Sequence, residues 1–369
     1  MLSLVPGPVP VSPELAAIAG ADEFPYFRGE VFTRLILDLT ADVQMLFRTR
    51  ATPLTVTSSG TGLMEMAIVN LLDPGHRVVV VNGGNFGQKW VRMCRSFRVE
   101  VTDFQVPLGR SPDLDALADS IPGDARALLI NAHETSTGYL YDLQRIGEIA
   151  RKKDLLFIVD GVSSVGADEY RMDEWGIDCS LVSSQKALGC MPGLGFIAFS
   201  ERARKVIPTV RQPRHYFDAL DYETNLPRGQ LPFTPAVFAI LQVKRQLENI
   251  RAMGLAAFVE RHRRLAQVFR DAVLADPRFG LLPERPSNAI SAVTLPPGVA
   301  TTPLVRHLRL EYDSWFATNH TGQEHYLRVS HMGHLDADAM REVARQIHRT
   351  ADRLTASPSG TDADPVRAQ

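Results

Sequence analysis

Residues 178–195 read D-C-S-L-V-S-S-Q-K-A-L-G-C-M-P-G-L-G. The first part of this stretch, residues 179–184, is apolar or small and is typical of a buried strand in an α/β sheet. It leads directly to Lys186 and a glycine-rich turn. A lysine held among small and apolar residues can lose its proton and form a Schiff base with an aldehyde. Lys186 is therefore a candidate nucleophile, and a surface lysine that merely follows a strand is the alternative.

A second stretch, residues 155–166, reads L-L-F-I-V-D-G-V-S-S-V-G, and its apolar residues run directly into Asp160. A carboxylate at the end of an apolar strand is costly unless a cation accompanies it. Pyridoxal 5'-phosphate would give both groups a partner, because its aldehyde reacts with Lys186 and its protonated ring nitrogen pairs with Asp160. The two residues together therefore predict a pyridoxal-phosphate enzyme.

Further motifs occur in order along the chain. They are P-G-P at residues 6–8, H-E-T-S-T-G at 133–138, V-D-G-V-S-S at 159–164, S-S-Q-K-A-L at 183–188 and L-R-V at 327–329. Together they resemble the class V aminotransferases, which are fold type I pyridoxal-phosphate enzymes, and in particular the branch of alanine:glyoxylate and 2-aminoethylphosphonate:pyruvate aminotransferases. The resemblance implies an α/β fold in which a large domain holds a mainly parallel seven-stranded sheet between helices and a small C-terminal domain is α+β.

Composition and charge narrow the class of protein. The chain has 369 residues, of which 45% are hydrophobic, so it can bury a large core and should divide into two structural units. A net charge of −2, with no block rich in lysine or arginine, argues against nucleic acid or a membrane as partner. The three cysteines are odd in number and show no C-x-x-C spacing, which argues against a disulfide framework or a zinc site. The first residues are a poor signal peptide, and no apolar run approaches the ~20 residues that a transmembrane helix needs. We therefore expect a cytoplasmic enzyme with small-molecule substrates.

The order of the expected elements supports this architecture. Strand-like segments at 78–81, 99–101, 127–131, 155–159, 180–183 and 195–199 alternate with helix-like segments at 31–47, 63–72, 87–97, 114–120 and 143–152. Such alternation implies a mainly parallel sheet covered on both faces. Helices at 237–253, 255–274 and 337–353 and strands at 289–294 and 326–329 follow. We divide the chain into an amino-terminal arm that joins the small domain (1–20), a large cofactor-binding domain (21–255), a small C-terminal domain (256–354) and a disordered tail (355–369).

The S-S-G-T-G turn at residues 58–62 lies between an expected strand and an expected helix. Backbone N–H groups and the helix dipole make such a turn an anion site, and an ordinary capped glycine turn is the alternative. The resemblance implies that the Thr61 and Gly62 amides and the Thr61 hydroxyl hold the cofactor phosphate, with Gln185 in reach. It also implies that Thr234 of the partner subunit completes this site, so we expect a homodimer with active sites at the interface.

The remaining site residues also follow from the resemblance. Phe86, in N-G-G-N-F-G-Q, would stack on the cofactor ring where relatives have tryptophan or tyrosine, with simple core packing as the alternative. Thr135 would bond near the phenolic oxygen of the ring. Arg328 would grip the substrate carboxylate, since a planar guanidinium fork suits a carboxylate, with a surface ion pair as the alternative. Ser330 stands where relatives have glycine, which changes the pocket behind Arg328.

The resemblance implies a ping-pong transamination that moves an amino group from a small amino acid or amine donor to a 2-oxo acid. Lys186 would carry a proton between the substrate α-carbon and the cofactor. A pyridoxal-phosphate lyase, decarboxylase or carbon–carbon bond-forming enzyme of a specialised biosynthetic pathway is the main alternative. A cysteine desulfurase fits less well, because neither Cys94 nor Cys190 lies in a clear mobile, thiolate-favouring loop, and the joint presence of Lys186, Asp160 and Arg328 argues against a non-catalytic binding protein.

The substrate remains open among alanine with glyoxylate, 2-aminoethylphosphonate, pyridoxamine and a specialised biosynthetic intermediate. The segment at residues 24–28, F-P-Y-F-R, is more aromatic than the small polar residues expected near the pocket mouth. Trp315, Phe316 and Asn319 are further candidates for the pocket lining.

Overall fold

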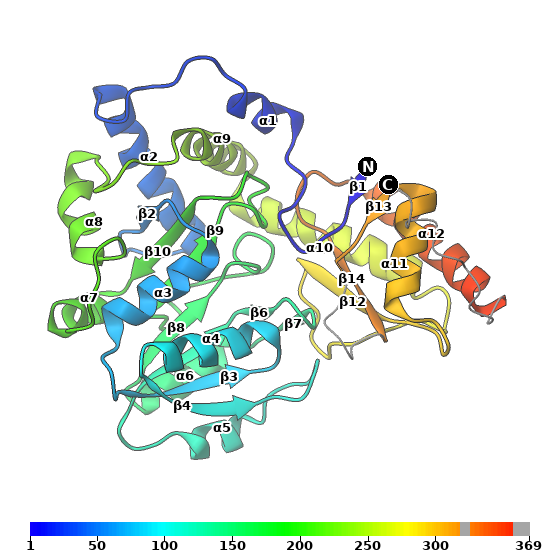
Figure 1. The fold of residues 1–369 in the computed structure, drawn as a ribbon, viewed down its shortest axis with the longest axis horizontal. Helices are drawn as coiled ribbons and strands as arrows, with labels where there is room; N and C mark the ends of the chain where they lie inside the picture. Colours follow the sequence, from blue (N-terminus) through cyan, green and yellow to red (C-terminus); the bar gives the residue numbers. More distant parts are fainter. Residues whose placement is uncertain (318–324, 357–369) are drawn as a thin grey trace, which may run out of the picture.

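The computed structural model describes residues 1–317 and 325–356. These residues form a large α/β part and a smaller C-terminal part that lie side by side (Figure 1). Asn319, a candidate for the pocket lining, and residues 357–369 of the expected tail lie outside the described residues.

A seven-stranded sheet forms the centre of the large part. Its strands lie in the order β2 (Leu54–Val56), β10 (Gly195–Phe199), β9 (Cys179–Ser183), β8 (Leu156–Asp160), β5 (Ala125–Asn131), β3 (Arg77–Asn82) and β4 (Glu100–Gln105). β10 runs antiparallel to both of its neighbours, and every pair from β9 to β4 is parallel. The apolar runs of β3, β8 and β9 are buried, as strands covered on both faces require. The predicted α/β fold with a mainly parallel seven-stranded sheet is confirmed.

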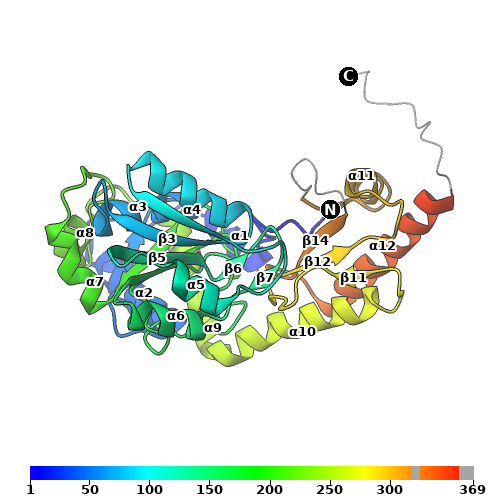
Figure 2. The same cartoon turned by 90° about the horizontal axis from the view of Figure 1, so that it is seen from below.

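Helices cover both faces of this sheet (Figure 2). α3 (Gly60–Leu71) and α4 (Asn85–Ser96) lie on one face, and α2 (Glu30–Phe47), α6 (Leu143–Lys152) and α9 (Val237–Met253) lie on the other. The shorter helices of the large part are α5 (Leu114–Ser120), α7 (Glu201–Val206) and α8 (Ala219–Asn225). α3 begins at Gly60 rather than at residue 63, because the Ser59 hydroxyl caps it by accepting a hydrogen bond from the Gly62 N–H at 3.2 Å.

The smaller part is an α+β unit. α10 (Leu255–Val273) runs from the large part into it (Figure 2). There, the antiparallel sheet of β11 (Gly280–Leu281), β12 (Ile290–Thr294) and β14 (Tyr326–Ser330) packs with α11 (Thr301–Tyr312) and α12 (Ala337–Ala356). Its buried apolar cluster is distinct from the core of the large part. α12 continues through Thr355 and Ala356, so the expected tail does not begin at residue 355.

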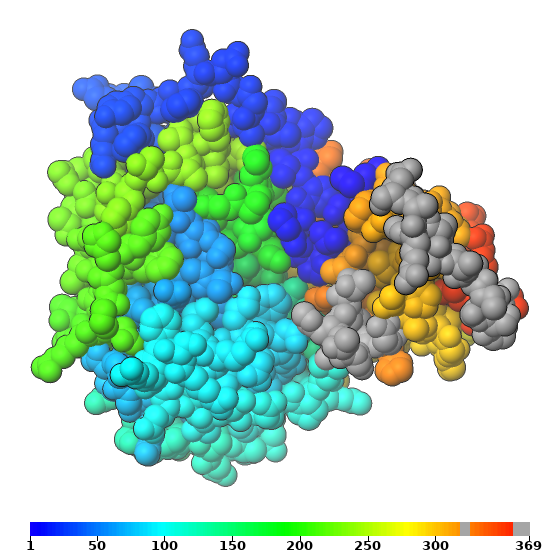
Figure 3. Space-filling model, viewed as in Figure 1, coloured from blue at the N-terminus to red at the C-terminus, as the bar shows by residue number. Residues whose placement is uncertain are grey.

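The amino-terminal segment, residues 1–12, connects the two parts. β1 (Leu2–Ser3) pairs in parallel with β13 (Ser314–Trp315), and Leu4 lies in the core of the smaller part. The chain then crosses to α1 (Pro13–Ala19), where the Leu15 carbonyl accepts a hydrogen bond from Gln242 of α9 at 2.7 Å. In the space-filling view these first residues fill the boundary between the two parts on the face shown (Figure 3).

Membrane insertion through a helix has no support in this structure. Within residues 1–317 and 325–356, no helix is both long and apolar enough to cross a bilayer.

Candidate active site

The parallel strands β5, β8 and β9 end side by side, and their last residues are polar. In register, Asn131 at the end of β5 lies opposite Asp160 at the end of β8. β9 ends at Ser183, and the chain reaches Lys186 three residues later. Because the carboxyl ends of parallel strands form one edge of a sheet, this topology brings the two predicted catalytic residues to the same crevice.

The Lys186 amine lies under the amino-terminal segment. Its Nζ donates a hydrogen bond to the Pro6 carbonyl at 2.6 Å. Gly7 has a φ of +136°, and a Cβ at this position would lie 2.6 Å from the Lys186 Nζ, so only glycine fits here without displacing the lysine. Burial lowers the pKa of Lys186 to about 8; Asp160 opposes this change, and the charges of Arg328 and Lys89 add to it. The amine therefore loses its proton more readily than a solvated lysine.

Asp160 is buried, and both of its oxygens are hydrogen bonded. Oδ1 accepts from the Val162 N–H at 2.8 Å, and Oδ2 accepts from the Asn131 Nδ2 at 2.9 Å. Burial raises the pKa of Asp160 to about 6, against the effect of the Val162 N–H and of the Lys89 and Lys186 charges. A cationic ring nitrogen brought to this carboxyl would favour its ionised form.

The predicted phosphate end of the site is the start of α3. Thr61 lies in the first turn of this helix, where N–H groups have no partner within the helix. The Gly62 N–H is already bound by the Ser59 hydroxyl. A Cβ at Gly62 would lie 2.1 Å from the Ser58 Oγ and 2.9 Å from the Phe217 Cζ, so glycine is required for this close packing.

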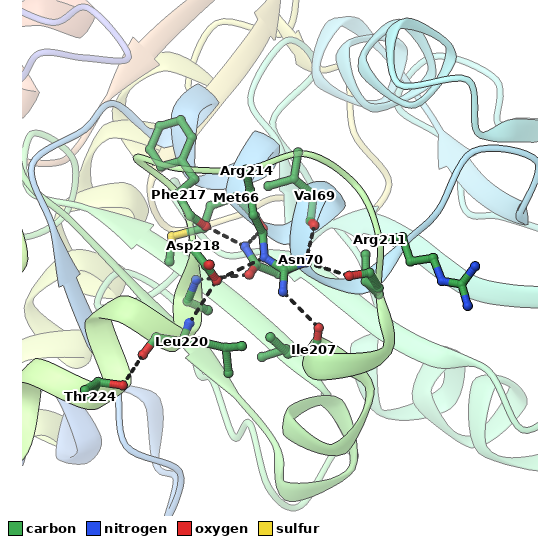
Figure 4. A network of polar contacts seen from close by, with 12 residues as sticks. Met66, Val69, Asn70, Ile207, Arg211, Arg214, Phe217, Asp218, Leu220 and Thr224 are labelled. Carbon is green, nitrogen blue, oxygen red and sulfur yellow. Dashed lines mark hydrogen bonds and ion pairs between the residues drawn. The ribbon is translucent and has the colours of Figure 1, made fainter.

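A polar network holds Phe217 against α3 (Figure 4). Asn70, which is fully buried on α3, donates to the Phe217 carbonyl at 2.7 Å and accepts from the Ala219 N–H at 3.0 Å. Arg214 donates to the carbonyls of Val69 and Ile207 at 3.2 and 3.0 Å. This network therefore fixes the loop that packs against the predicted phosphate site.

The predicted ring-stacking residue, Phe86, is partly exposed in the first turn of α4. The Glu134 carboxylate positions this turn by accepting from the Phe86 and Gly87 N–H groups at 3.3 and 3.0 Å. Next to Glu134, the Thr135 hydroxyl donates to the Ser163 hydroxyl at 2.9 Å. Phe86 and Thr135 are thus linked through one turn, the hairpin that begins with β6 (His133–Glu134).

The smaller part contributes Arg328 to the same region. Arg328 lies on β14, is buried, and its Nη1 donates to the Thr135 carbonyl at 3.3 Å. Burial lowers the pKa of Arg328, while the Tyr326 and Glu134 side chains oppose that change. Tyr326, two residues earlier on the strand, donates from its hydroxyl to the Ser136 carbonyl at 2.8 Å. β14 is therefore docked on the turn that holds Thr135.

Other candidates lie apart from this cluster. Thr234 is exposed, and its predicted role in the site of the partner subunit stays a prediction. Phe24 packs on Phe238, with ring centroids 5.1 Å apart. Phe316 belongs to the core of the smaller part, which argues against its assignment to the pocket lining. The Trp315 ring is partly exposed and lies 4.7 Å from the Arg309 guanidinium, and its place in the pocket lining stays a prediction.

Several buried polar atoms around the strand ends have no hydrogen-bond partner in the described structure. They include the Ser183 Oγ, the Gln185 Oε1 and the His133 Nε2. Burial lowers the pKa of His133 to about 3, so its ring is neutral. Unsatisfied buried polar atoms are uncommon in native proteins, and water, ions and bound ligands are among the groups that supply their partners. Together with Lys186 and Asp160, this donor and acceptor set fits pyridoxal phosphate.

Two residues that contact the predicted site residues were not themselves predicted to belong to the site. Lys89 donates from its Nζ to the Thr61 Oγ1 at 3.1 Å, and Glu134 holds the start of α4. The position of Lys89, three residues after Phe86 on a helix, was the signal that could have identified it, because such pairs share one face.

The fold and the site together define a pyridoxal-phosphate enzyme of fold type I. The family model described as Aminotransferase class-V matches residues 26–309. The chain therefore belongs to the class V aminotransferase family, and it is a pyridoxal-phosphate-dependent aminotransferase.

Individual relatives cover most of the chain. It is 34% identical over 355 residues to the L-aspartate–glyoxylate aminotransferase of Paracoccus denitrificans (strain Pd 1222), a match that covers 92% of this chain and 88% of that protein. It is 32% identical over 323 residues to the serine–glyoxylate aminotransferase of Arabidopsis thaliana, covering 84% and 79%. The crystal structure of the subgroup IV aspartate aminotransferase from Thermus thermophilus has a TM-score of 0.88 at 27% identity, covering 96% of this chain and 100% of that one.

Proposed function

We propose that this aminotransferase moves the amino group of a small amino acid to glyoxylate. The observation that carries the proposal is the partly buried amine of Lys186 at the edge of the sheet that also holds Asp160, with Arg328 docked on the adjacent turn. The names of the relatives from Paracoccus denitrificans and Arabidopsis thaliana support glyoxylate as the acceptor, and they support aspartate or serine as the first donors to test.

Each residue of the site has a distinct proposed role. Pyridoxal phosphate supplies an aldehyde and an electron-withdrawing ring. Thr61, with the first turn of α3 and Gln185, would hold its phosphate, and Phe86 and Thr135 would contact its ring.

The acid–base work falls to Asp160 and Lys186. Asp160 would keep the ring nitrogen protonated. The Lys186 amine, whose pKa is lowered to about 8 by burial, would take a proton from the substrate α-carbon and return it.

Arg328 is the proposed carboxylate-binding residue. Its guanidinium group is buried, so a carboxylate placed on it would be recognised away from bulk water, where a charge-assisted hydrogen bond is stronger. The amino group of an α-amino acid bound in this way would be directed toward the strand ends that carry Lys186.

We further propose that the enzyme is a homodimer that works in the cytoplasm. Three large aromatic residues are exposed, and a second subunit would cover them. Their exposed fractions are 55% for Phe24, 68% for Tyr26 and 38% for Tyr216. Thr234 is exposed and would be available to the active site of the partner subunit. All three cysteines are free thiols, as expected in a reducing compartment. Size-exclusion chromatography with light scattering would test the dimer, and a monomeric mass would contradict it.

A cysteine desulfurase, one of the alternative functions, has little support. Cys94, Cys179 and Cys190 are all buried, and burial raises the pKa of each thiol. A persulfide-forming cysteine needs an accessible thiolate, which none of these residues provides.

The decisive experiment follows both half-reactions with purified protein. A panel of amino acids that includes aspartate, serine and alanine is offered with glyoxylate, and products are identified. Equal amounts of glycine and of the 2-oxo acid of the donor support the proposal. Release of ammonia or carbon dioxide in place of glycine would identify a lyase or a decarboxylase. The visible absorbance of the bound cofactor should be lost in Lys186→Ala.

A further inference from the structure

Lys89 is a charged residue of the active site to which the proposed reaction gives no role. It lies on α4, where its Nζ donates to the Thr61 Oγ1 at 3.1 Å and lies 4.8 Å from the centroid of the Phe86 ring. The charge of Lys89 also acts on both catalytic groups: it opposes the rise in the pKa of Asp160 and adds to the fall in the pKa of Lys186. Its ammonium group therefore borders the start of α3 and the predicted position of the cofactor ring at the same time.

The groups around this ammonium are suited to an anion. The Thr61 hydroxyl accepts the hydrogen bond from Lys89, so its own hydrogen can be donated elsewhere. Ser183 is fully buried, its Oγ has no partner in the described structure, and it lies 3.5 Å from the place that a Cβ on Gly60 would take. Gly60 opens α3, whose first N–H groups and dipole favour negative charge.

We propose that Lys89 binds the phosphate group of the cofactor and is a main determinant of its affinity. This inference rests on the proposed function. A phosphate at the start of α3 would receive charge-assisted hydrogen bonds from Lys89 and from the Thr61 hydroxyl. The second carboxylate of a dicarboxylic amino acid is the other anion with suitable chemistry. The phosphate is favoured because Lys89 contacts Thr61, the residue of α3 that is predicted to hold the phosphate.

The test separates the phosphate from the rest of the cofactor. Cofactor-free protein is titrated with pyridoxal phosphate and, separately, with pyridoxal, which has the same ring and aldehyde but no phosphate. Lys89→Met is expected to weaken the binding of pyridoxal phosphate by roughly tenfold to a hundredfold and to change the binding of pyridoxal by a much smaller factor. Lys89→Arg should retain most of the affinity, because it keeps the charge. Lys205→Met, which removes an exposed lysine of α7, is the matched control and should change neither affinity.

Specific results would overturn the inference. Equal weakening of both ligands, or of neither, would show that Lys89 does not act on the phosphate. A Lys89→Met enzyme with unchanged cofactor affinity and a raised KM for dicarboxylic donors alone would place Lys89 on the substrate instead. If the wild-type protein itself does not bind pyridoxal phosphate, both the proposed function and this inference fail, which distinguishes that result from the others.

Discussion

Burial brings the pKa values of Lys186 and Asp160 toward neutrality, to about 8 and about 6. Loss of solvation is the largest cause for both groups and outweighs their mutual attraction. Groups that exchange protons work best when their pKa lies near the working pH. Lys186 is therefore poised for proton transfer, while Asp160 at the same edge of the sheet becomes ionised readily beside a cation, in agreement with an aminotransferase.

The lowered pKa of Lys186 predicts a pH dependence of stability. Its folded-state pKa of about 8 lies below the ordinary value of 10.5, so between these pH values the unfolded chain binds more protons. The free energy of unfolding of cofactor-free wild type should therefore rise relative to Lys186→Met over this range, by at most ~3 kcal/mol. Denaturant unfolding at several pH values measures this difference. A difference that does not change with pH would mean that Lys186 keeps an ordinary pKa.

Asp160→Asn should remove the charge that keeps the ring nitrogen protonated. We expect kcat/KM to fall by roughly 10²-fold to 10⁴-fold, while the cofactor stays bound through Lys186 and the start of α3. Steady-state kinetics and the visible absorbance of the cofactor check the two parts of this prediction. Asp154→Asn, which changes an exposed carboxylate, is the control. Activity close to that of wild type would exclude Asp160 from the reaction.

The residues that the strands bring to the active site could be predicted from the sequence, because each lies at the end of its strand or directly after it along the chain. Lys186 and Asp160 are of this kind. The spacing of Lys89 from Phe86 places the two on one helix face, but it does not reveal the contact of Lys89 with Thr61. That contact, and the contact of Glu134 with the start of α4, depend on how helices and hairpins pack.

Among the elements, α3 depends on glycine at its start. Gly62→Ala would gain ~0.5–1 kcal/mol of helix propensity, but its Cβ would lie 2.1 Å from the Ser58 Oγ and 2.9 Å from the Phe217 Cζ. Overpacking of this kind costs ~1–3 kcal/mol, so we expect net destabilisation and weaker cofactor binding. Gly123→Ala, with no atom within 4 Å of the added Cβ, is the control for thermal unfolding. Unchanged stability of Gly62→Ala would mean that Ser58 and Phe217 move aside freely.

The loop that follows α7 depends on Asn70 of α3 (Figure 4). Asn70→Ala leaves the Phe217 carbonyl and the Ala219 N–H without their partner, and we expect a loss of ~2–4 kcal/mol in the free energy of unfolding. The control is Asn249→Ala, which removes an exposed bond of 3.3 Å to Glu14. Denaturant unfolding compares the variants. A loss no larger than that of the control would show that the network is not needed.

Helices with a clear apolar period were predicted with correct bounds, as for α5, α6 and α9. α1, α7, α8 and α11 were not predicted. Two of these helices, α1 and α11, contain proline in the first turn, at Pro13 and Pro303. In the first turn its missing N–H removes no intrahelical hydrogen bond, so the helix is not interrupted.

In the whole molecule, the amino-terminal segment bonds to both parts. The Leu4 carbonyl accepts from the Ser330 N–H at 3.0 Å, and the Val9 N–H donates to the Gln185 carbonyl at 3.2 Å. Leu4→Ala should therefore cost ~2–5 kcal/mol and also reduce activity, because the segment carries the carbonyl that binds Lys186. Val31→Ala, at an exposed position, is the control. Reduced stability with full activity would contradict the coupling.

The location of Leu4 has a consequence for how the enzyme matures on the ribosome. The core that surrounds this side chain is built from residues 265–351, which are synthesised long after Leu4. Leu4 must therefore wait, without its final partners, until these residues have been made. A nascent chain that had reached only the end of the large part would have its reactive lysine but not the docked cover that orients it, so competence for catalysis should arise only after the smaller part has been synthesised.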